Sequence, residues 1–442
     1  MLKKVLLILV LASILAGFLF WRHFYASQSP QPRIEDRLPD GDFLIRANVL
    51  DVARESSGML YFNKIPFRDF FSYEFLLGQG RSFGLNIQEP AYFFANETGD
   101  WGALVQVDDY TKISPGIQRL KKMLSLQQGL YQKHETYFWK EENAYLSYGK
   151  KWLFIYKGDH FKTYLERVIN AKNGDVSVAW DSFLKEKIFE NQKLVMMSNW
   201  KDMKKYGIEK AILAHDSDSS SFTVLSYFKS SKPWNFGKKP NGKTLAINHL
   251  TDKYINIHMD VEAFRKHPED PLYLFLLRYS NKISFPFADF LEAWEGDLSF
   301  RQGGLQTVQE RYIETELDEN FNVSEISKVR EVRVPGFALA LSLNDKANYF
   351  FSRIKAKGIM TEENEKVRLL LSPALNQKKI DDYYLFYSGE FTPKMKDNTV
   401  NNGLWSEKGT KYNFQLDSLS KDEAFGIITF PVKSIIKRNK FF

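Results

Sequence analysis

The sequence contains one literal match to a catalytic motif, the phosphate-binding P-loop. Residues 237–244 read Gly-Lys-Lys-Pro-Asn-Gly-Lys-Thr and satisfy the pattern G-x-x-x-x-G-K-[ST]. A working P-loop needs backbone amides around a phosphate and a helix that begins just beyond the lysine. Pro240 lacks an amide hydrogen, and the residues after Thr244 alternate between apolar and polar as strands do. These residues therefore predict a lysine-rich linker and no nucleotide site.

Two other short patterns approach ligand-binding motifs but miss required positions. Residues 78–84, GQGRSFG, miss the dinucleotide-binding glycine spacing by one residue. Residues 216–220 begin like a calcium loop, but Ser221 and Tyr227 occupy the positions that need Gly and Glu. A mobile loop explains the first pattern and a hairpin turn explains the second.

Carboxylates and histidines supply the remaining candidates. Glu292, Glu295 and Asp297 lie close together in sequence, as the paired carboxylates of a glycoside hydrolase could. His249 and His258 fall on separate predicted strands and could form a metal pair. We expect structural roles instead: a helix end that turns into a strand, and ordinary sheet positions. The sequence thus predicts no catalytic, cofactor-binding or metal-binding residue, and a protein that is not an enzyme.

The first 25 residues predict where the protein lies. Lys3 and Lys4 precede an uncharged apolar run of 17 residues, 5–21, which as a helix spans ~25 Å, near the lower limit for a hydrocarbon core of ~30 Å. The positive-inside bias then predicts an inner-membrane, single-pass signal-anchor with a cytoplasmic N-terminus and a periplasmic body. A cleaved signal peptide and a buried core helix are the alternatives. The predicted anchor residues are Val5, Leu6, Leu7, Ile8, Leu9, Val10, Leu11, Ile14, Leu15, Phe18, Leu19, Phe20 and Trp21.

Composition excludes several classes of chemistry. The chain has no cysteine, so disulfides, thiolate catalysis and lipidation at a cysteine are excluded. Its net charge of +7 is spread through the chain without a basic stripe, which argues against nucleic acid as a partner. Aromatic residues are in excess, with 37 Phe, 22 Tyr and 9 Trp. They indicate twisted sheets filled by rings, or else an apolar groove for a lipid or peptide.

A recurring pattern predicts the fold class. A short alternating strand ends at a polar residue and continues into an amphipathic helix. Between these units lie hairpin-like pairs such as residues 136–158, with turns at Glu142-Asn143 and Gly149-Lys150. The combination predicts an α+β protein with antiparallel sheets and helices packed on one face. The pattern occurs at 43–56, 102–123, 152–170, 254–267, 336–358 and 425–439.

The spacing of this pattern predicts two related domains. It occurs three times before residue 175 and three times after residue 250, and the segment between is rich in lysine, proline and glycine. The predicted organisation is a transmembrane helix at 1–25, an extended tether at 26–40, a first α+β domain at 41–230, a linker at 231–244 and a second α+β domain at 245–442.

Three phrases carry a resemblance to a protein family. They are GLNIQEPAYFFANETGDWGALVQVDDYTKI (84–113), FLEAWEGDLSF (290–300) and PGFALALSLNDKANYFFSRIKAKG (335–358). The chain resembles uncharacterised exported envelope proteins of Bacteroidetes, over roughly residues 38–442. The resemblance implies duplicated α+β halves. Many members are lipoproteins, and this chain departs from them because it lacks a lipobox cysteine. No catalytic residue follows from the resemblance.

The sequence as a whole predicts a membrane-anchored periplasmic protein that acts by binding. The first hypothesis is a non-catalytic scaffold or accessory subunit of an envelope complex, with sheet edges or an aromatic face as its docking surface. The alternative is a periplasmic carrier or chaperone for lipid or unfolded protein. The expected partners are the membrane, through the N-terminal helix, and proteins of the envelope. Lipid is a possible ligand, no cofactor is expected, and nucleic acid is excluded.

Overall fold

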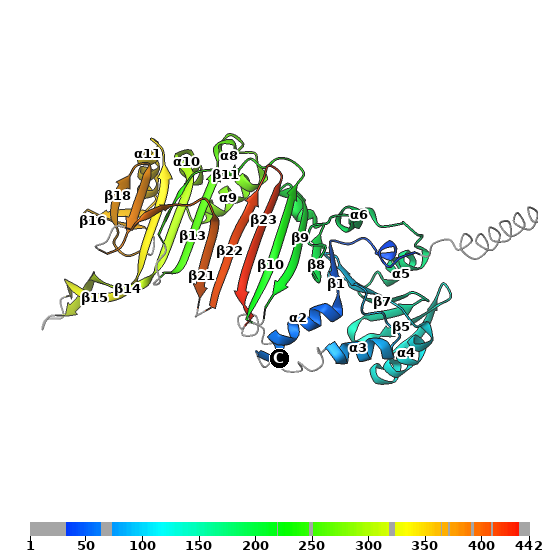
Figure 1. The fold of residues 1–442 in the computed structure, drawn as a ribbon. Coiled ribbons are helices and arrows are strands. Elements are labelled where there is room, and N and C mark those ends of the chain that lie inside the picture. Colours follow the sequence, from blue (N-terminus) through cyan, green and yellow to red (C-terminus); the bar gives the residue numbers. More distant parts are fainter. Residues whose placement is uncertain are drawn as a thin grey trace, which may run out of the picture. The chain divides into compact units, whose positions relative to one another are not determined.

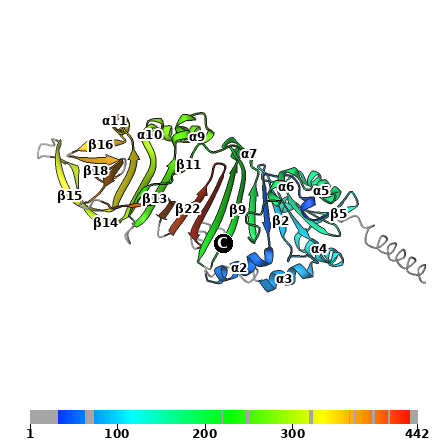
Figure 2. The same ribbon diagram turned by 45° about the horizontal axis from the view of Figure 1, so that its top comes forward.

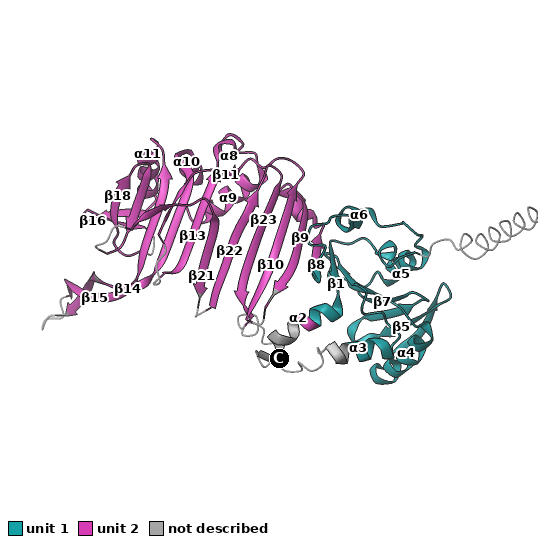
Figure 3. Ribbon diagram, in the orientation of Figure 1, with its two compact units in different colours: residues 1–53, 69–194 teal, residues 54–68, 195–442 magenta. Residues whose placement is uncertain are grey.

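The computed structural model divides the chain into two compact units, and each is rich in antiparallel strands (Figure 3). Unit 1 comprises residues 1–53 and 69–194, and unit 2 comprises residues 54–68 and 195–442. The structure describes residues 32–62, 73–218, 220–246, 251–317, 323–363, 365–369, 372–389, 393–407 and 410–432.

Unit 1 is built on an antiparallel sheet with the strand order β1-β2-β3-β7-β6-β5-β4. The strands are β1 (Phe43–Ala47), β2 (Ala91–Ala95), β3 (Trp101–Gln106), β4 (Gln127–Tyr131), β5 (His134–Trp139), β6 (Ala144–Tyr148) and β7 (Trp152–Lys157). The helices that begin in this unit are η2 (Glu35–Arg37), α2 (Val49–Phe62), α3 (Tyr73–Ser82), α4 (Tyr110–Leu124), η4 (Lys140–Glu142), α5 (Phe161–Asn170) and α6 (Val178–Leu184).

Helix α4 shows how the sequence builds the core of this unit. The Asp109 carboxylate accepts a hydrogen bond from the Thr111 amide and so caps the first turn. Ile113 and Ile117, four residues apart, are buried on the side of the helix that faces the sheet. They pack in one cluster with Tyr137 of β5, Tyr148 of β6 and Leu153 of β7, so strands β5–β7 and α4 share a core.

Unit 2 is built on a larger antiparallel sheet (Figure 1). Its strand order is β8-β9-β10-β23-β22-β21-β13-β14-β15-β19-β18. The strands are β8 (Leu194–Ser198), β9 (Ile208–Ser217), β10 (Ser221–Ser230), β13 (Thr251–Asp260), β14 (Trp294–Leu317), β15 (Val323–Leu343), β18 (Asn376–Ile380), β19 (Tyr383–Tyr387), β21 (Asn401–Glu407), β22 (Thr410–Leu419) and β23 (Glu423–Pro431).

Short strands and helices complete unit 2. Strand β11 pairs with the end of β13, β12 pairs with β20, and β16 pairs with β17. These short strands are β11 (Gly237–Lys238), β12 (Lys243–Leu245), β16 (Met360–Glu363), β17 (Lys366–Leu369) and β20 (Met395–Asp397). The helices are α7 (Lys201–Lys205), α8 (Glu262–Lys266), α9 (Pro271–Lys282), α10 (Phe287–Ala293) and α11 (Ala347–Ala356).

Helices cover one face of one part of the unit 2 sheet. Phe264 of α8, Tyr273 of α9, Leu291 of α10 and Phe350 of α11 are buried in a single cluster. The sheet contributes residues of β13, β14, β15 and β19 to this cluster, for example Leu341 of β15. Helices α9, α10 and α11 lie together beside this part of the sheet (Figure 2).

The predicted fold class, two related α+β domains of similar size, is wrong. Strands make up 47% of the structure and helices 26%, and one large antiparallel sheet dominates. Strands β9 and β10, which the sequence assigned to the first domain, belong to unit 2, where β10 pairs with β23 at the other end of the chain. The strand–helix repeat is a local pattern, whereas strand partners in a sheet are set by non-local contacts that such a pattern does not encode.

The segment expected to be a linker is part of unit 2. Residues 231–244 lie between β10 and the end of β12, and they include β11 and the start of β12. The division found in the structure falls at residue 194/195.

The predicted inner-membrane, single-pass anchor is corrected. Within the described ranges, no helix is both long enough and apolar enough to cross a membrane. The apolar run at residues 5–21 lies outside the described residues. We therefore withdraw the transmembrane, signal-anchor and inner-membrane assignment.

Candidate functional site

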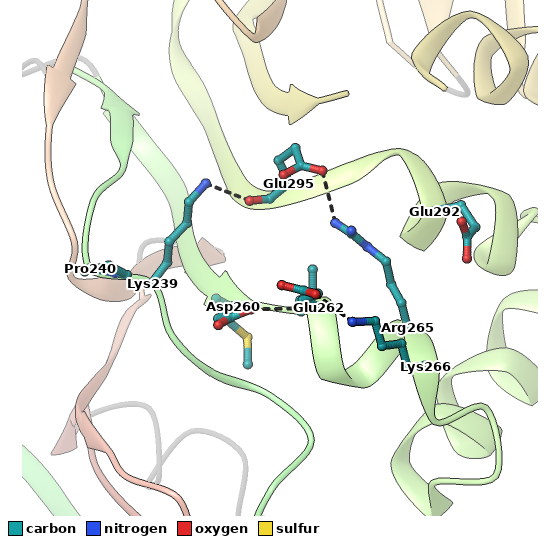
Figure 4. A pocket seen from close by; sticks show the side chains of 10 residues that line it. Lys239, Pro240, Asp260, Glu262, Arg265, Lys266, Glu292 and Glu295 are labelled. Atoms are coloured by element: carbon teal, nitrogen blue, oxygen red, sulfur yellow. Dashed lines mark hydrogen bonds and ion pairs between the residues drawn. The ribbon is translucent and has the colours of Figure 1, made fainter. Parts of the chain in front are cut away.

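A cavity in unit 2 gathers charged side chains of both signs (Figure 4). Its volume is about 590 Å³. It lies where the β11–β12 loop, the end of β13, helix α8 and the start of β14 meet. The lining residues are Lys239, Pro240, Met259, Asp260, Val261, Glu262, Arg265, Lys266, Glu292 and Glu295.

Lys239 connects this cavity to a buried carboxylate. Its ammonium group donates to the Glu295 carbonyl oxygen and to Asp297 Oδ2, both at 2.7 Å. The Lys239 side chain is 27% exposed, whereas that of Asp297 is 1% exposed. Tyr383 of β19 donates its hydroxyl hydrogen to the same Asp297 oxygen at 2.8 Å. Asp297 is therefore a buried anion whose partners reach it from three separate segments.

His258 completes the cluster around Asp297. The two residues lie opposite each other in the β13–β14 pair, and His258 Nδ1 is 2.7 Å from Asp297 Oδ1. Because an ionised carboxylate only accepts hydrogen bonds, Nδ1 carries the hydrogen. The His258 side chain is fully buried, and its Nε2 has no hydrogen-bond partner among the described residues. The pair resembles the base and orienting acid of a nucleophilic triad. Both side chains are buried, however, so a substrate could not reach them.

Hydrogen bonding controls the protonation of this cluster. Burial alone would raise the pKa of Asp297, but hydrogen bonds from His258, Lys239 and Tyr383 outweigh it and hold that pKa below its usual value of 3.8. Burial, together with the Asp297 carboxylate, raises the pKa of the Tyr383 hydroxyl. Asp297 is thus ionised and Tyr383 is neutral at physiological pH.

A second set of contacts holds the opposite wall of the cavity. Arg265 of α8 donates through Nε to the Leu291 carbonyl oxygen at 2.7 Å, and it also bonds the Trp294 carbonyl oxygen. Its other contact is Glu295 Oε1 at 3.2 Å, and Asn344 donates to that oxygen at 3.0 Å. The guanidinium group satisfies carbonyls at the end of α10 and so fixes α8 against the start of β14.

The cluster makes the protein less stable in acid. Because the folded-state pKa of Asp297 lies below 3.8, its ionised form stabilises the folded protein above that pH, and the contribution is lost as pH falls through the folded-state pKa. We expect the difference in unfolding free energy between wild type and Asp297→Asn to have its full size at about pH 6 and to become smaller below about pH 4. Urea denaturation at a series of pH values measures this difference. A difference that does not change with pH would contradict this account.

The P-loop pattern falls on two short strands. Gly237 and Lys238 form β11, and Lys243 and Thr244 begin β12. In the described part that follows, the next element is strand β13, so no helix N-terminus is placed to face a phosphate. The segment instead supplies Lys239 to the Asp297 cluster, a role that the motif did not indicate.

The structure brings together candidates that the sequence left separate. His258 and Asp297 are in contact, and Glu292 and Glu295 line the adjoining cavity. His249 lies outside the described residues. Over the described ranges, no group of three or more acidic or histidine side chains could hold a metal ion.

The sequence reasoning missed two members of the site. Tyr383 and Arg265 lie 86 and 32 residues from Asp297 and carry no motif. Only the alternation of β19, which pairs with β15, could have placed Tyr383 on a sheet face. The remaining patterns form ordinary structure: residues 78–82 end α3, and Asp218 accepts hydrogen bonds from the Ser220 and Ser221 amides in the β9–β10 turn.

A second candidate surface lies on the sheet of unit 2, on β10, β21, β22 and β23. The strand registers place Trp405 opposite Tyr412, Phe414 opposite Ile428, and Phe430 opposite Phe222. Because cross-strand partners and alternate residues of one strand share a face, all six side chains point to the same side. We call this set the aromatic face; its members are Phe222, Trp405, Tyr412, Phe414, Ile428 and Phe430.

The aromatic face is partly open to solvent. Trp405 and Phe414 are each 40% exposed, and Ile428 is 45% exposed. Neighbouring rings of the face pack against one another. The centre of the Phe430 ring lies 5.2 Å from that of Phe222 and 6.4 Å from that of Tyr412. One cation borders the face, because the Lys253 ammonium group lies 4.4 Å from the centre of the Trp405 ring. The helix-packed cluster of unit 2 includes no residue of these four strands within the described residues.

Comparison with known proteins adds little. No protein-family model and no curated protein matches the chain. Solved structures titled crystal forms I, III and IV of TP0453 are similar to part of it, at 7–8% identity and TM-scores of 0.30–0.31. The matches cover 45–47% of this chain and 81% of the other. Likeness at this level carries no argument, and the resemblance to Bacteroidetes envelope proteins stays a prediction.

Proposed function

We propose that this protein is a non-catalytic scaffold or accessory subunit that binds a partner protein through the aromatic face of unit 2. The observation that carries the proposal is the run of aromatic and apolar side chains across four neighbouring strands, of which Trp405, Phe414 and Ile428 are 40–45% exposed. The centres of protein interfaces are rich in aromatic residues and poor in charged ones. Exposed apolar patches on folded proteins mark interaction surfaces.

Lys253 borders this face at Trp405, and the centre of the face carries no charge, which supports a protein partner. None of its six members is charged, and the positions between them on the same face, Gly403, Val224, Leu416 and Gly426, are also uncharged. The cavity differs from the aromatic face because many of its charged side chains bond one another. Lys266 donates to Glu262, and Arg265 donates to Glu295. Groups engaged in this way support a structural role for the cavity.

The alternative, a carrier for lipid or unfolded protein, needs an enclosed apolar cavity. The cavity of about 590 Å³ is lined mainly by charged residues, which suit water and ions better than an acyl chain. The aromatic face is a surface and does not enclose a ligand. The carrier hypothesis therefore has less support than the scaffold hypothesis, and the experiment below separates the two.

The test compares wild type with a double variant, Trp405→Glu and Phe414→Glu. Both side chains are half-exposed, so the fold should tolerate the change, while a buried charge would oppose docking. The partner is identified by cross-linking mass spectrometry in the source cells, purified, and titrated by calorimetry. Loss of two central aromatic contacts should weaken the complex by at least about 30-fold.

The matched control is Trp101→Glu in unit 1, where a tryptophan is 42% exposed outside the aromatic face. It should leave the affinity unchanged, and circular dichroism should show that all variants are folded. Equal partner affinity in wild type and the double variant would refute the proposal. Lipid that co-purifies with wild type alone, without a protein partner, would favour the carrier.

A further inference from the structure

Strand β4 of unit 1 ends its sheet with an open edge. In the described part of the chain it pairs with β5 and with no other strand. Four of its five residues, Gln127, Gln128, Gly129 and Leu130, are exposed. The backbone groups on its outer side therefore have no neighbouring strand, which is the condition under which another chain can add one.

The turn that follows β4 fixes which backbone groups point outward. Tyr131 and His134 pair directly and enclose the two-residue turn Gln132–Lys133. Such a closing pair exchanges both hydrogen bonds, and the bonded residues then alternate along the strand. Gln127, Gly129 and Tyr131 thus bond to β5, whereas the N–H and C=O groups of Gln128 and Leu130 point away from the sheet.

The composition of β4 leaves this edge unprotected. Natural proteins protect exposed edge strands with lysine, proline or other charged residues. The edge strand β18 of unit 2 follows that rule, because it carries Lys378 and Lys379. Strand β4 reads Gln-Gln-Gly-Leu-Tyr and has neither a charge nor a proline. Strand β4 therefore lacks the charged side chains of its own that protect β18.

Strand β4 leaves an apolar side chain uncovered on the side of the sheet that faces the core of unit 1. Gln128 lies opposite the buried Tyr137, so Leu130, two residues along β4, is on the same core-facing side. Leu130 is nevertheless 72% exposed. A strand placed beside β4 would cover it with an apolar side chain and extend the core by one row.

Charge selects the kind of strand that fits. The Lys121 ammonium group of α4 donates to Gln128 Oε1 at 2.9 Å, so a cation lies on the edge itself. Lys133 is exposed in the turn at the other end of β4. The nearby Glu135 carboxylate accepts hydrogen bonds from two tyrosine hydroxyls at 2.6 and 2.8 Å. Glu135 keeps its negative charge, but two lysines against one carboxylate leave a net positive charge that favours a strand with an acidic side chain.

We propose that β4 binds an extended segment of a partner protein as an added strand, with an apolar and an acidic residue two positions apart on its core-facing side. The apolar side chain covers Leu130 and the carboxylate, two residues along, meets Lys121 beside Gln128, while the exposed Lys133 adds positive charge at the turn. A second copy of this chain is the weaker candidate, because pairing two five-residue edges buries far less than the ~1,200 Å² of stable dimers. This surface is separate from the aromatic face, so either proposal can fail alone.

The test uses two capped synthetic peptides of about seven residues with threonine at every second position; the positions between carry valine and glutamate in turn in one peptide, and valine and lysine in turn in the other, so that valine and the charged residue share a face. Gln128→Pro removes an outward N–H without removing a bond to β5. The matched control is Gln377→Pro. It replaces an exposed glutamine of β18 that is followed by two lysines. Fluorescence anisotropy gives the affinities. Hydrogen exchange of wild type reports the amides of Gln128 and Leu130 and does not depend on how the proline variant folds.

We expect the glutamate–valine peptide to bind wild type at least about tenfold more tightly than the lysine–valine peptide. Gln128→Pro should weaken binding at least about tenfold, Gln377→Pro should not, and the peptide should slow exchange at Gln128 and Leu130. Equal affinity for both peptides, no binding, or binding without slower exchange at these two amides would overturn the proposal. Dimerisation through β4 without peptide binding would assign the edge to a second copy instead.

Discussion

Replacing Asp297 with asparagine is expected to lower the free energy of unfolding by about 3–5 kcal/mol at neutral pH. The carboxylate is 1% exposed and accepts hydrogen bonds from His258, Lys239 and Tyr383. Asparagine keeps the shape but removes the charge, so the Lys239 ammonium group loses its buried counter-ion. It also offers an N–H₂ group where one of these donors needs an acceptor.

Urea denaturation of the full chain measures this effect, with hydrogen exchange of β13 and β14 to show that unit 2 is the part destabilised. The matched control is Asp381→Asn. Asp381 also pairs with a lysine, Lys243, at 3.2 Å, but its side chain is 67% exposed. Exposed pairs contribute about 0–1 kcal/mol, so the control should change stability little.

A double-mutant cycle with Lys239→Met tests whether the lysine is the main partner. If the two residues act as one buried pair, the combined loss should be smaller than the sum of the single losses by at least about 1 kcal/mol. A loss below about 1 kcal/mol for Asp297→Asn, or strictly additive losses, would contradict the proposed cluster. The loss would then belong to the surrounding backbone contacts.

Local structure in this chain could be predicted from the sequence because local rules govern it. The pairs β3–α4, β7–α5 and β15–α11 lie where alternation changes to helical spacing. The turn at Glu142-Asn143 is present, with Asn143 in the left-handed conformation. Each of these features depends on residues that are close together in sequence.

The sheet of unit 2 and the Asp297 cluster could not be predicted in this way. The cluster joins residues 239, 258, 297 and 383, and the sheet pairs β10 with β23 across about two hundred residues. No spacing rule connects such distant positions. In the sequence, Lys239, His258 and Asp297 belong to three unrelated patterns, and none of these patterns indicates that the three side chains meet. The common role of these residues becomes apparent only when β13 and β14 are paired.

The second large effect is expected at Gly296, the residue that allows this pairing. Gly296 has a φ of +94°, and a Cβ added there would lie 1.8 Å from the Met259 carbonyl oxygen. The β13–β14 strands therefore approach so closely that a side chain at this position does not fit. Gly296→Ala should lower the free energy of unfolding by at least about 3 kcal/mol, from backbone strain together with the clash.

Gly99→Ala separates the two causes. Gly99 has a similar φ of +88°, but a Cβ there would meet no atom within 4 Å. Gly99→Ala should lower the free energy of unfolding through backbone strain alone, by about 1–2 kcal/mol. Equal losses at Gly296 and Gly99 in urea denaturation would mean that the contact with Met259 relaxes without cost. A larger loss at Gly296, together with faster hydrogen exchange at His258, would show that this glycine positions the histidine against Asp297. The buried cluster would then depend on one backbone position as much as on its own charges.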